Sequence, residues 1–399
     1  MPPPPLPRLR LRHIHLPTPG PTPSSSPPYA LASRLQSHLR RRLLDFKDDP
    51  TSFSAQPLPT LVSFSPLPIF TLGRRQTAPL TQKEQERLQS PLHFGSNGIS
   101  LPVRTLHSPR GGLTTYHGPG QIVLWPIVDL KSKVQSTKQF TVRCYSRLLE
   151  QATVSTLEKL FGIKAGWNDE NPGVWVGDGV LKEEKKIAAL GVHLRRYVSG
   201  LGTAINVDMD GSSSSSSEEE EDEGRTNPWK RVVACGLEGK EVTSVREVLG
   251  SREKLDELLG MMDGEEKTKT REEKVADAWA KEFAERIGIE GGEVERVKEG
   301  EIVQVLSRLL EEENEGCEQG EGTEEEMEYF ELLKKRGVKT CRPKFTYRAV
   351  FNAMCVCTYL SQPPTGAAVE RILPAAAAAT AAAAAAAAAA VTQPSPHIP

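Results

Sequence analysis

The chain has 399 residues and a formal net charge of −2, which argues against a general nucleic-acid-binding protein with a basic surface. Only 38% of its residues are hydrophobic, and it contains 31 prolines and 32 glycines. Part of its length is therefore expected to be disordered. No apolar run has both the length and the hydrophobicity of a membrane-spanning helix, so we expect a soluble protein.

The six cysteines show no metal-binding pattern, because no two of them have the CxxC spacing. We expect a reduced, intracellular compartment and one catalytic thiol. The cysteines are Cys144, Cys235, Cys317, Cys341, Cys355 and Cys357.

The chain starts with an arginine-rich stretch that contains serines at 24–26 and seven arginines before its first acidic residue, Asp45, and residues 1–30 are assigned to an N-terminal segment. This composition resembles a mitochondrial transit peptide. The alternative is a disordered tail, since the many prolines oppose a helix. Residues 30–44 fit an amphipathic basic helix, either the end of a presequence or the first helix of the domain.

Two short strands separated by a proline are predicted within residues 60–72, and residues 73–100 are predicted to be mostly polar loop. A short strand at 101–106 leads into a glycine-rich run, and the apolar residues 122–128 after it predict a buried strand. Apolar residues at helical spacing over 140–161 predict a buried amphipathic helix.

Further strands are predicted at 174–176, 187–194 and 202–209. Strands that pair in sequence beside helices give an α+β class, with mixed sheets flanked by helices and with disordered termini. Residues 211–226 contain a serine run followed by an acidic run, which predicts a flexible low-complexity insertion. Phosphorylation of the serines is the alternative reading of this segment.

The main domain is assigned to residues 31–255, and residues 256–342 to a charged helical extension. Within the extension, Trp279, Phe283 and Ile287 lie four residues apart and predict one apolar helix face. Residues 343–399 form a low-complexity, alanine-rich tail to which we assign no function.

The run from Arg110 to Gln121 packs four glycines, a proline, a histidine and an arginine into twelve positions. Such density suits a backbone that approaches a ligand closely, although a glycine-rich loop alone is a weak signal. Further along, Lys186 precedes an apolar strand, where desolvation favours a neutral amine. Cys235 lies between small residues, and a cysteine attacks a thioester only as a thiolate. Taken singly, these two residues fit a surface lysine and a buried structural cysteine.

Together and in this order, the segments RGGLTTYHGPGQ, KIAALG and ACGL resemble the lipoyl(octanoyl) transferases, an acyltransferase family with the biotin/lipoate protein ligase fold. The resemblance covers roughly residues 60–250. It implies that Cys235 attacks the thioester of octanoyl-acyl carrier protein while Lys186 accepts or balances the thiol proton. The octanoyl group then passes to a lysine of a lipoyl domain. No metal or nucleotide cofactor is implied.

The resemblance also implies which residues bind the substrate. For His117, a role in positioning the substrate and a role in holding the loop are equally open. Two positions depart from the family pattern. Ala234 stands in place of proline, and Leu201 in place of a histidine, so that histidine's hydrogen bond is absent. The implied substrate-binding residues are Arg110, Gly111, Gly112, Leu113, Thr114, Thr115, Tyr116, His117, Ala189, Leu190, Gly191, Leu201, Gly202 and Thr203.

By the same resemblance, the partners are octanoyl-acyl carrier protein and lipoyl-domain proteins, namely the glycine cleavage H protein and 2-oxo-acid dehydrogenase subunits. Arg74, Arg75, Arg195 and Arg196 are candidates to dock these acidic partners. No nucleic-acid or membrane partner is expected, and the expected location is the mitochondrion. Two other functions stay open: an ATP-dependent lipoate or biotin protein ligase, and a non-catalytic relative that binds lipoyl domains.

Overall fold

The computed structural model describes residues 9–95, 98–132, 140–177, 184–209, 224–232, 241–260, 269–316 and 323–335. The following sequence-based predictions lie outside these residues: residues 1–8 of the N-terminal segment, the catalytic Cys235, residues 211–223 of the acidic insertion, and the tail at 343–399.

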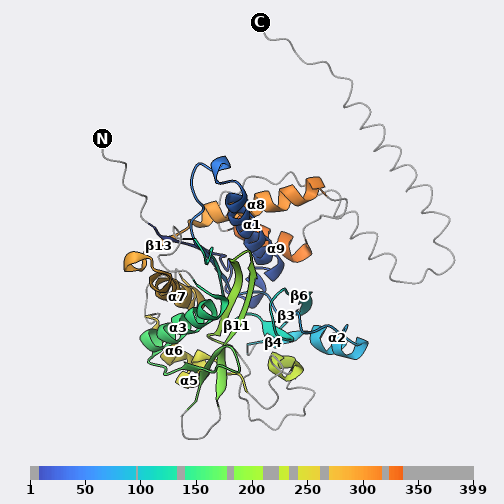
Figure 1. The fold of residues 1–399 in the computed structure, drawn as a ribbon. Coiled ribbons are helices and arrows are strands. Elements are labelled where there is room, and N and C mark those ends of the chain that lie inside the picture. Colours follow the sequence, from blue (N-terminus) through green and yellow to red (C-terminus); the bar gives the residue numbers. More distant parts are fainter. Residues whose placement is uncertain are drawn as a thin grey trace, which may run out of the picture. The chain divides into compact units, whose positions relative to one another are not determined.

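One mixed sheet of eight strands forms the centre of the described fold (Figure 1). β1 runs parallel to both of its neighbours, and every other pair in the sheet is antiparallel. This arrangement confirms the predicted α+β class with mixed sheets. In spatial order the strands are β13 (Val294–Arg296), β1 (Leu11–His15), β2 (Thr60–Phe64), β8 (Gln121–Ile127), β12 (Val198–Asn206), β11 (Lys185–Arg195), β10 (Val174–Val176) and β9 (Gly166–Trp167).

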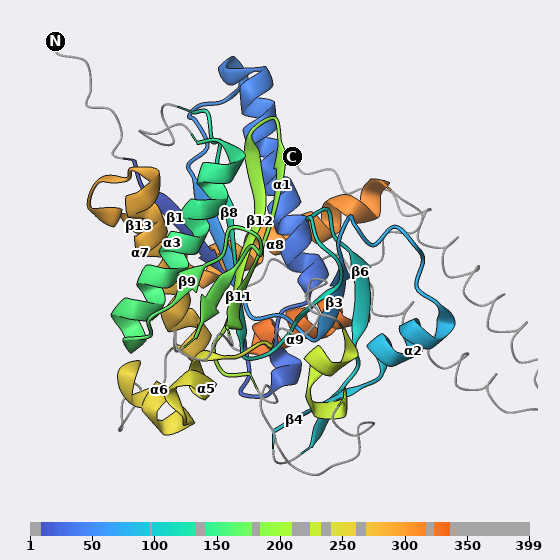
Figure 2. The same cartoon turned by 60° about the horizontal axis from the view of Figure 1, so that its bottom comes forward.

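Helices cover both faces of this sheet (Figure 2). On one face, α3 (Val142–Phe161) and α7 (Arg271–Ile287) enclose a hydrophobic cluster, with α5 (Val245–Leu249) and α6 (Arg252–Leu258) beside them. On the other face, α1 (Tyr29–Asp48), α8 (Glu299–Gly316) and α9 (Glu324–Lys335) enclose a second cluster. The amphipathic helices predicted at 30–44 and 140–161 are therefore confirmed.

Two small sheets lie beside the large one and support the glycine-rich loop. The first has the order β6 (Arg104–His107), β3 (Ile69–Leu72), β7 (Thr115–His117), and the second pairs β4 (Leu92–Phe94) with β5 (Ile99–Leu101). The prediction that residues 73–100 are mostly loop was wrong, because this region also contains α2 (Gln82–Gln89). Thr81 and Glu84 form a capping box at its start, a signal that the sequence carried.

Residues 9–30, the described part of the segment 1–30, contradict the disorder predicted for it. β1 is buried except at Arg12, and it pairs with β2 on one side and β13 on the other. The prolines at 17–28 lie after β1, in the connection to α1, where they interrupt no sheet hydrogen bond, whereas those at 2–7 lie outside the described residues. Residues 11–15 are therefore part of the core.

The domain boundary predicted at residue 255 was also wrong, because α7 and the elements after it pack into the same hydrophobic core as residues 31–255. Trp279 and Phe283 of α7 are fully buried and stack with ring centroids 5.1 Å apart. The indole nitrogen of Trp279 donates to Thr153 Oγ1 of α3 over 3.0 Å. This contact confirms the predicted apolar face and joins α7 to the domain rather than to an extension.

Candidate active site

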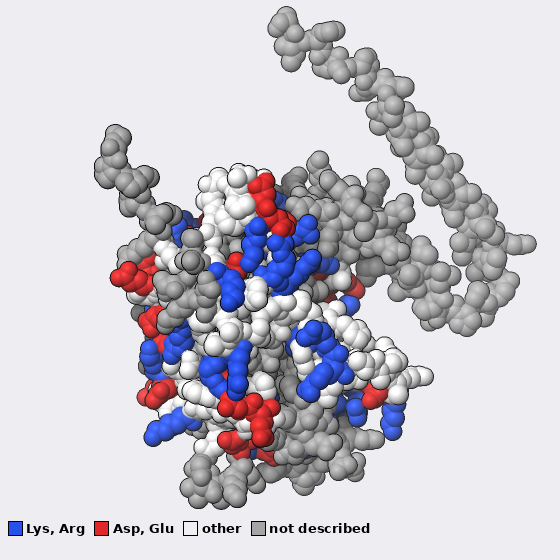
Figure 3. Space-filling model, in the orientation of Figure 1, with Lys and Arg blue, Asp and Glu red and all other residues white. Residues whose placement is uncertain are grey.

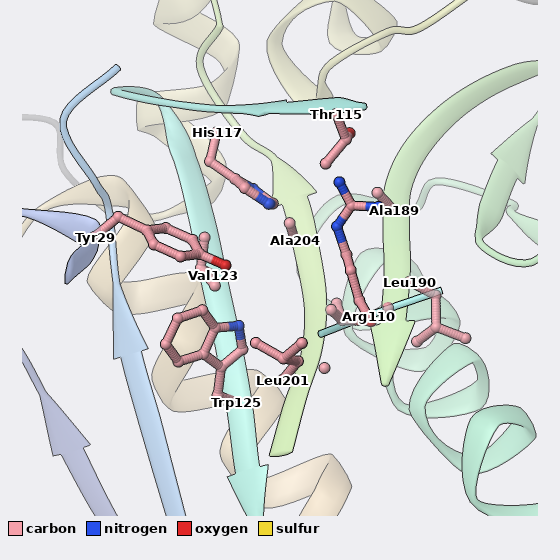
Figure 4. Close-up of a pocket in the computed structure, with 13 residues that line it drawn as sticks. Tyr29, Arg110, Thr115, His117, Val123, Trp125, Ala189, Leu190, Leu201 and Ala204 are labelled. Carbon is pink, nitrogen blue, oxygen red and sulfur yellow. The ribbon is translucent and has the colours of Figure 1, made fainter. Parts of the chain in front are cut away.

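A narrow pocket opens on the α1 face of the large sheet, between the glycine-rich loop and strands β8, β12 and β11 (Figure 4). Its cavity volume is about 30 Å³, which is enough for one or two waters. Most of its walls are apolar or bare backbone. The lining residues are Tyr29, Arg110, Thr115, His117, Val123, Trp125, Ala189, Leu190, Gly191, Leu201, Gly202, Thr203 and Ala204.

Strand alternation in β7 decides which loop residues reach the pocket. Thr115 and His117 point into it. Tyr116 points to the opposite side and packs on Phe70 and Trp229, with centroids 5.3 and 5.7 Å away. The TYH segment therefore contributes two side chains to the pocket and one to the core beneath it.

Arg110 holds the loop together with its guanidinium group. Its two terminal nitrogens donate to the carbonyl oxygens of Leu113, at 2.7 Å, and Thr71, at 2.5 Å. The aliphatic part of the side chain lies over Gly191, where an added Cβ would come within 2.9 Å of Arg110 Cδ. The methylene groups of Arg110 thus line the pocket, while its guanidinium group is hydrogen-bonded within the loop and to β3.

A chain of buried amides fixes the orientation of His117. Asn206 Nδ2 donates to the carbonyl oxygen of Thr243 at 2.9 Å, so its Oδ1 is left to accept from Gln121 Nε2 at 2.8 Å. Gln121 therefore presents Oε1 to His117 Nδ1 at 2.7 Å. Because a carboxamide oxygen only accepts, Nδ1 carries the ring proton and Nε2 keeps its lone pair.

Burial lowers the pKa of His117 to about 4, and the nearby Arg110 acts in the same direction. The ring is stacked on Tyr29 at a centroid distance of 5.5 Å. His117 is therefore neutral near pH 7, with Nδ1 protonated. In this state Nε2 can accept a hydrogen bond but cannot donate one to a carbonyl oxygen.

Lys186 is buried near the start of β11, as expected for a lysine that enters an apolar strand. Its Nζ lies 3.2 Å from the carbonyl oxygen of Pro172 and 4.6 Å from the centroid of the Trp175 ring. Lys185 is more exposed and its ammonium group lies 2.5 Å from a carboxylate oxygen of Glu241. Lys186 does not line the pocket, which begins three residues further along the strand at Ala189, roughly 10 Å away.

A short segment, 241–243, runs beside Lys186 and connects it to the amide chain. The Lys186 N–H donates to Glu241 O, and the Thr243 N–H donates to Lys186 O, both over 2.9 Å. Thr243 is also the residue whose carbonyl oxygen accepts from Asn206. The strand that carries Lys186 is thus tied to His117 through the backbone segment 241–243 and two side chains, those of Asn206 and Gln121.

A family model of the lipoyl protein ligase A/B catalytic domain matches residues 39–262. The chain belongs to this family. It is 33% identical over 219 residues to the "Probable octanoyltransferase" of Schizosaccharomyces pombe, covering 55% of this chain and 80% of that protein. It is 35% identical over 182 residues to a zebrafish protein, "Octanoyl-[acyl-carrier-protein]:protein N-octanoyltransferase LIPT2, mitochondrial", covering 46% and 64% of the two chains.

Within the lipoyl protein ligase A/B family, the protein groups with the octanoyltransferases and is an acyltransferase. A solved bipartite lipoate protein ligase from Thermoplasma acidophilum covers 81% of this chain and 97% of its own, with 16% identity and a TM-score of 0.43.

The structure brings nine of the residues expected from the family resemblance into the pocket. Gly111, Gly112, Leu113 and Thr114 do not line it; they form the turn that Arg110 braces, and Gly112 has a φ of +83°. Sequence reasoning missed Tyr29, Val123, Trp125 and Ala204. Alternation within β8 carried a signal for Val123 and Trp125, since both follow Gln121 at steps of two.

Among the described residues, no helix is long and apolar enough to cross a membrane. In the same part of the chain, His, Cys, Asp and Glu side chains form no group of three or more that could hold a metal ion.

Proposed function

We propose that this protein transfers an octanoyl group from octanoyl-acyl carrier protein to a lysine of lipoyl domains, the first step of protein lipoylation. One observation carries the proposal: the same strand, β11, bears the buried Lys186 and, three residues later, one wall of the apolar pocket. We place the reactive carbonyl of the acyl chain at the Lys186 end of this pocket, whose cavity of about 30 Å³ has to widen to admit the chain. The relatives named octanoyltransferase support this choice of acyl group.

In the first half-reaction, the Cys235 thiol gives its proton to neutral Lys186 and the thiolate attacks the octanoyl thioester carbon. The carbon–sulfur bond to the carrier breaks, and the leaving thiolate takes the proton back from Lys186. Backbone N–H groups near Cys235 and in the glycine-rich loop are the donors we assign to the tetrahedral oxyanion. His117 is not among these donors, because its Nε2 carries no proton.

In the second half-reaction, the neutral amine of a lipoyl-domain lysine attacks the octanoyl-Cys235 thioester. An amide bond forms, the bond to sulfur breaks, and the amine proton neutralises the thiolate. The His117 Nε2 lone pair faces the pocket and is available to accept an N–H of this amine. Its low pKa suits it to orient the amine rather than to keep the proton.

We also propose that exposed arginines beside the pocket dock the acidic partners. Lys and Arg side chains gather over α1 on the face shown in Figure 3. The pKa of His193 is lowered first by burial and then by the charges of Arg40, Arg74 and Arg195, and Arg40 lies 3.1 Å from its Nδ1. Arg196, a predicted docking residue, is instead paired with Asp48 at 2.6 Å.

We place the protein in the mitochondrion. The zebrafish and Drosophila melanogaster relatives carry that location in their names. The glycine cleavage H protein and 2-oxo-acid dehydrogenase subunits are the acceptors we propose. Because β1 belongs to the core, any presequence cleavage has to occur before Leu11 rather than near residue 30.

The experiment uses the full-length protein with octanoyl-acyl carrier protein, followed by intact-mass measurement. The proposal predicts a hydroxylamine-sensitive octanoyl adduct on Cys235 that a lipoyl domain discharges without ATP. The Cys235→Ser variant is expected to give neither the adduct nor transfer. Transfer that requires ATP and free octanoate would identify a ligase. Lipoyl-domain binding with no acyl transfer by the folded protein would identify a non-catalytic binding protein.

A further inference from the structure

Trp125 and Leu201 close one end of the pocket. In the close-up, these side chains lie at the opposite end from Thr115 and His117 (Figure 4). Trp125 is held in place because Tyr29 and Phe64 pack edge-on against its ring, at centroid distances of 5.1 and 4.7 Å. This end of the pocket is therefore a fixed apolar wall.

Leu201 reaches the wall through an unusual backbone conformation. Its φ is +59°, in the left-handed region that disfavours any residue with a Cβ. Strand alternation would place its side chain on the same face as its cross-strand partner, Val192. Val192 packs against the α3–α7 cluster, whereas Leu201 packs with Trp125 in the α1 cluster. The positive φ therefore turns the leucine side chain into the pocket.

Neighbouring groups hold Leu201 in this conformation. Buried Gln36 of α1 accepts the Leu201 N–H through its Oε1. An added Cβ at Gly200 would lie 2.6 Å from that oxygen, and one at Gly202 would lie 2.2 Å from Leu124 O. The backbone of β12 is thus closely packed on both sides of Leu201, at Gly200 and at Gly202. A strained residue that its surroundings hold in a ligand pocket indicates a functional role.

We infer that Leu201 sets the longest acyl chain that the pocket accepts. The inference rests on the proposed function and identifies the residue against which the end of the acyl chain packs. A chain that starts at the Lys186 end runs past Ala189 and Gly191 and meets Leu201 and Trp125. Each methylene that fits improves binding about fourfold, whereas the first methylene beyond the wall has to displace a held side chain. Removal of the leucine side chain frees room for about four carbons.

The test compares Leu201→Gly with the wild type on hexanoyl, octanoyl, decanoyl and dodecanoyl carrier thioesters, with the rate of acyl-Cys235 formation as the readout. Glycine tolerates the positive φ, so the backbone conformation and the Gln36 hydrogen bond are retained. The dodecanoyl-to-octanoyl ratio of kcat/KM is expected to rise by up to roughly 250-fold, at about fourfold for each of the four added methylenes. Val192→Ala is the matched control, because it shortens the facing residue of the same strand pair on the opposite side of the sheet.

Leu201→Ala is the second variant, since it keeps the wild-type backbone strain with a smaller side chain, and it is expected to shift the same ratio in the same direction. If both folded variants keep the wild-type chain-length profile, the inference is wrong while the proposed function stands. If Val192→Ala shifts the profile as much as Leu201→Gly, Leu201 is not the determinant. If the folded wild type forms no adduct with any donor, the proposed function itself fails.

Discussion

Gln121 donates from Nε2 to Asn206 Oδ1 over 2.8 Å, and this bond sets the proton position on His117. With its amide turned the other way, Gln121 would present an NH₂ group to His117 and favour the opposite tautomer. The orientation of Gln121 in turn depends on the Thr243 carbonyl at the far end of the chain. Two side chains that do not catalyse, Gln121 and Asn206, and one backbone carbonyl therefore decide what His117 can bind.

We predict that Gln121→Leu lowers kcat/KM for octanoyl transfer about 10- to 100-fold, as loss of a ligand-orienting partner commonly does. Loss of its partner also destabilises the fold by about 1–3 kcal/mol, because Asn206 Oδ1 is left buried without a donor. Nitrogen-15 NMR of the His117 ring separates orientation from stability. The wild type should show Nδ1 protonated and the variant a mixture of tautomers. A wild-type ring protonated at Nε2 would contradict this account.

Acid is predicted to destabilise the protein through His117. Its pKa is about 4 in the folded state against an ordinary value of 6.5, so the unfolded chain binds the proton more readily. The stability is complete above about pH 6.5 and is lost as the pH falls through 4. The loss from this residue is at most about 3 kcal/mol. His13 and His15, whose pKa values are also lowered by burial, act in the same direction.

Urea unfolding midpoints measured from pH 7.5 to 4.5 check this dependence. His117→Asn keeps a donor for Gln121 without a titrating ring, so its midpoint should vary less with pH than that of the wild type. His107→Asn, at an exposed position, is the control and should leave the pH dependence unchanged. Equal pH dependence in all three proteins would exclude His117 as a source.

The burial of β1 predicts how many N-terminal residues can be deleted without loss of stability. Deletion of residues 1–8 should leave the melting temperature unchanged, since β1 begins at Leu11. Deletion of residues 1–30 removes the partner of both β2 and β13 and the buried side chains of Leu11 and Ile14. We expect the shorter protein to be insoluble or to lose several kcal/mol of stability. A melting temperature equal to that of the full chain would show that β1 is dispensable.

Local patterns in the sequence predicted the elements whose signals are local. The helical spacing of Trp279 and Phe283 and the apolar run of β8 were sufficient to predict α7 and that strand. β1 was missed because its burial depends on strands about 50 and 280 residues away, which no local pattern reveals. The position of Leu201 in the pocket was expected only from the family resemblance. Its side chain faces the pocket because of one positive φ, which alternation cannot predict.

If the exposed arginines beside the pocket dock the acyl carrier protein, reversal of their charge should weaken its binding without changing the chemical step. The double variant Arg74→Glu with Arg195→Glu should raise KM for acyl carrier protein about tenfold and leave kcat unchanged, because rim charges act on encounter. Added salt should raise the wild-type KM in the same direction and affect the variant less. Arg87→Glu, on the exposed face of α2, is the control. A variant with normal KM and reduced kcat would contradict a docking role.

The two adjacent lysines of β11 make a matched pair for the catalytic step. Lys186→Met keeps a long apolar side chain against Trp175 and removes the amine, so acyl-Cys235 formation should fall about 10²- to 10⁴-fold. Lys185→Met loses a partly exposed ion pair with Glu241, so it should change the rate less than about threefold. The measurement is single-turnover release of the carrier thiol at several pH values. Removal of the base should also change the shape of the pH profile in Lys186→Met alone. If both variants lose the same rate of acyl-Cys235 formation and keep the wild-type pH profile, Lys186 has a structural role and another group is the base.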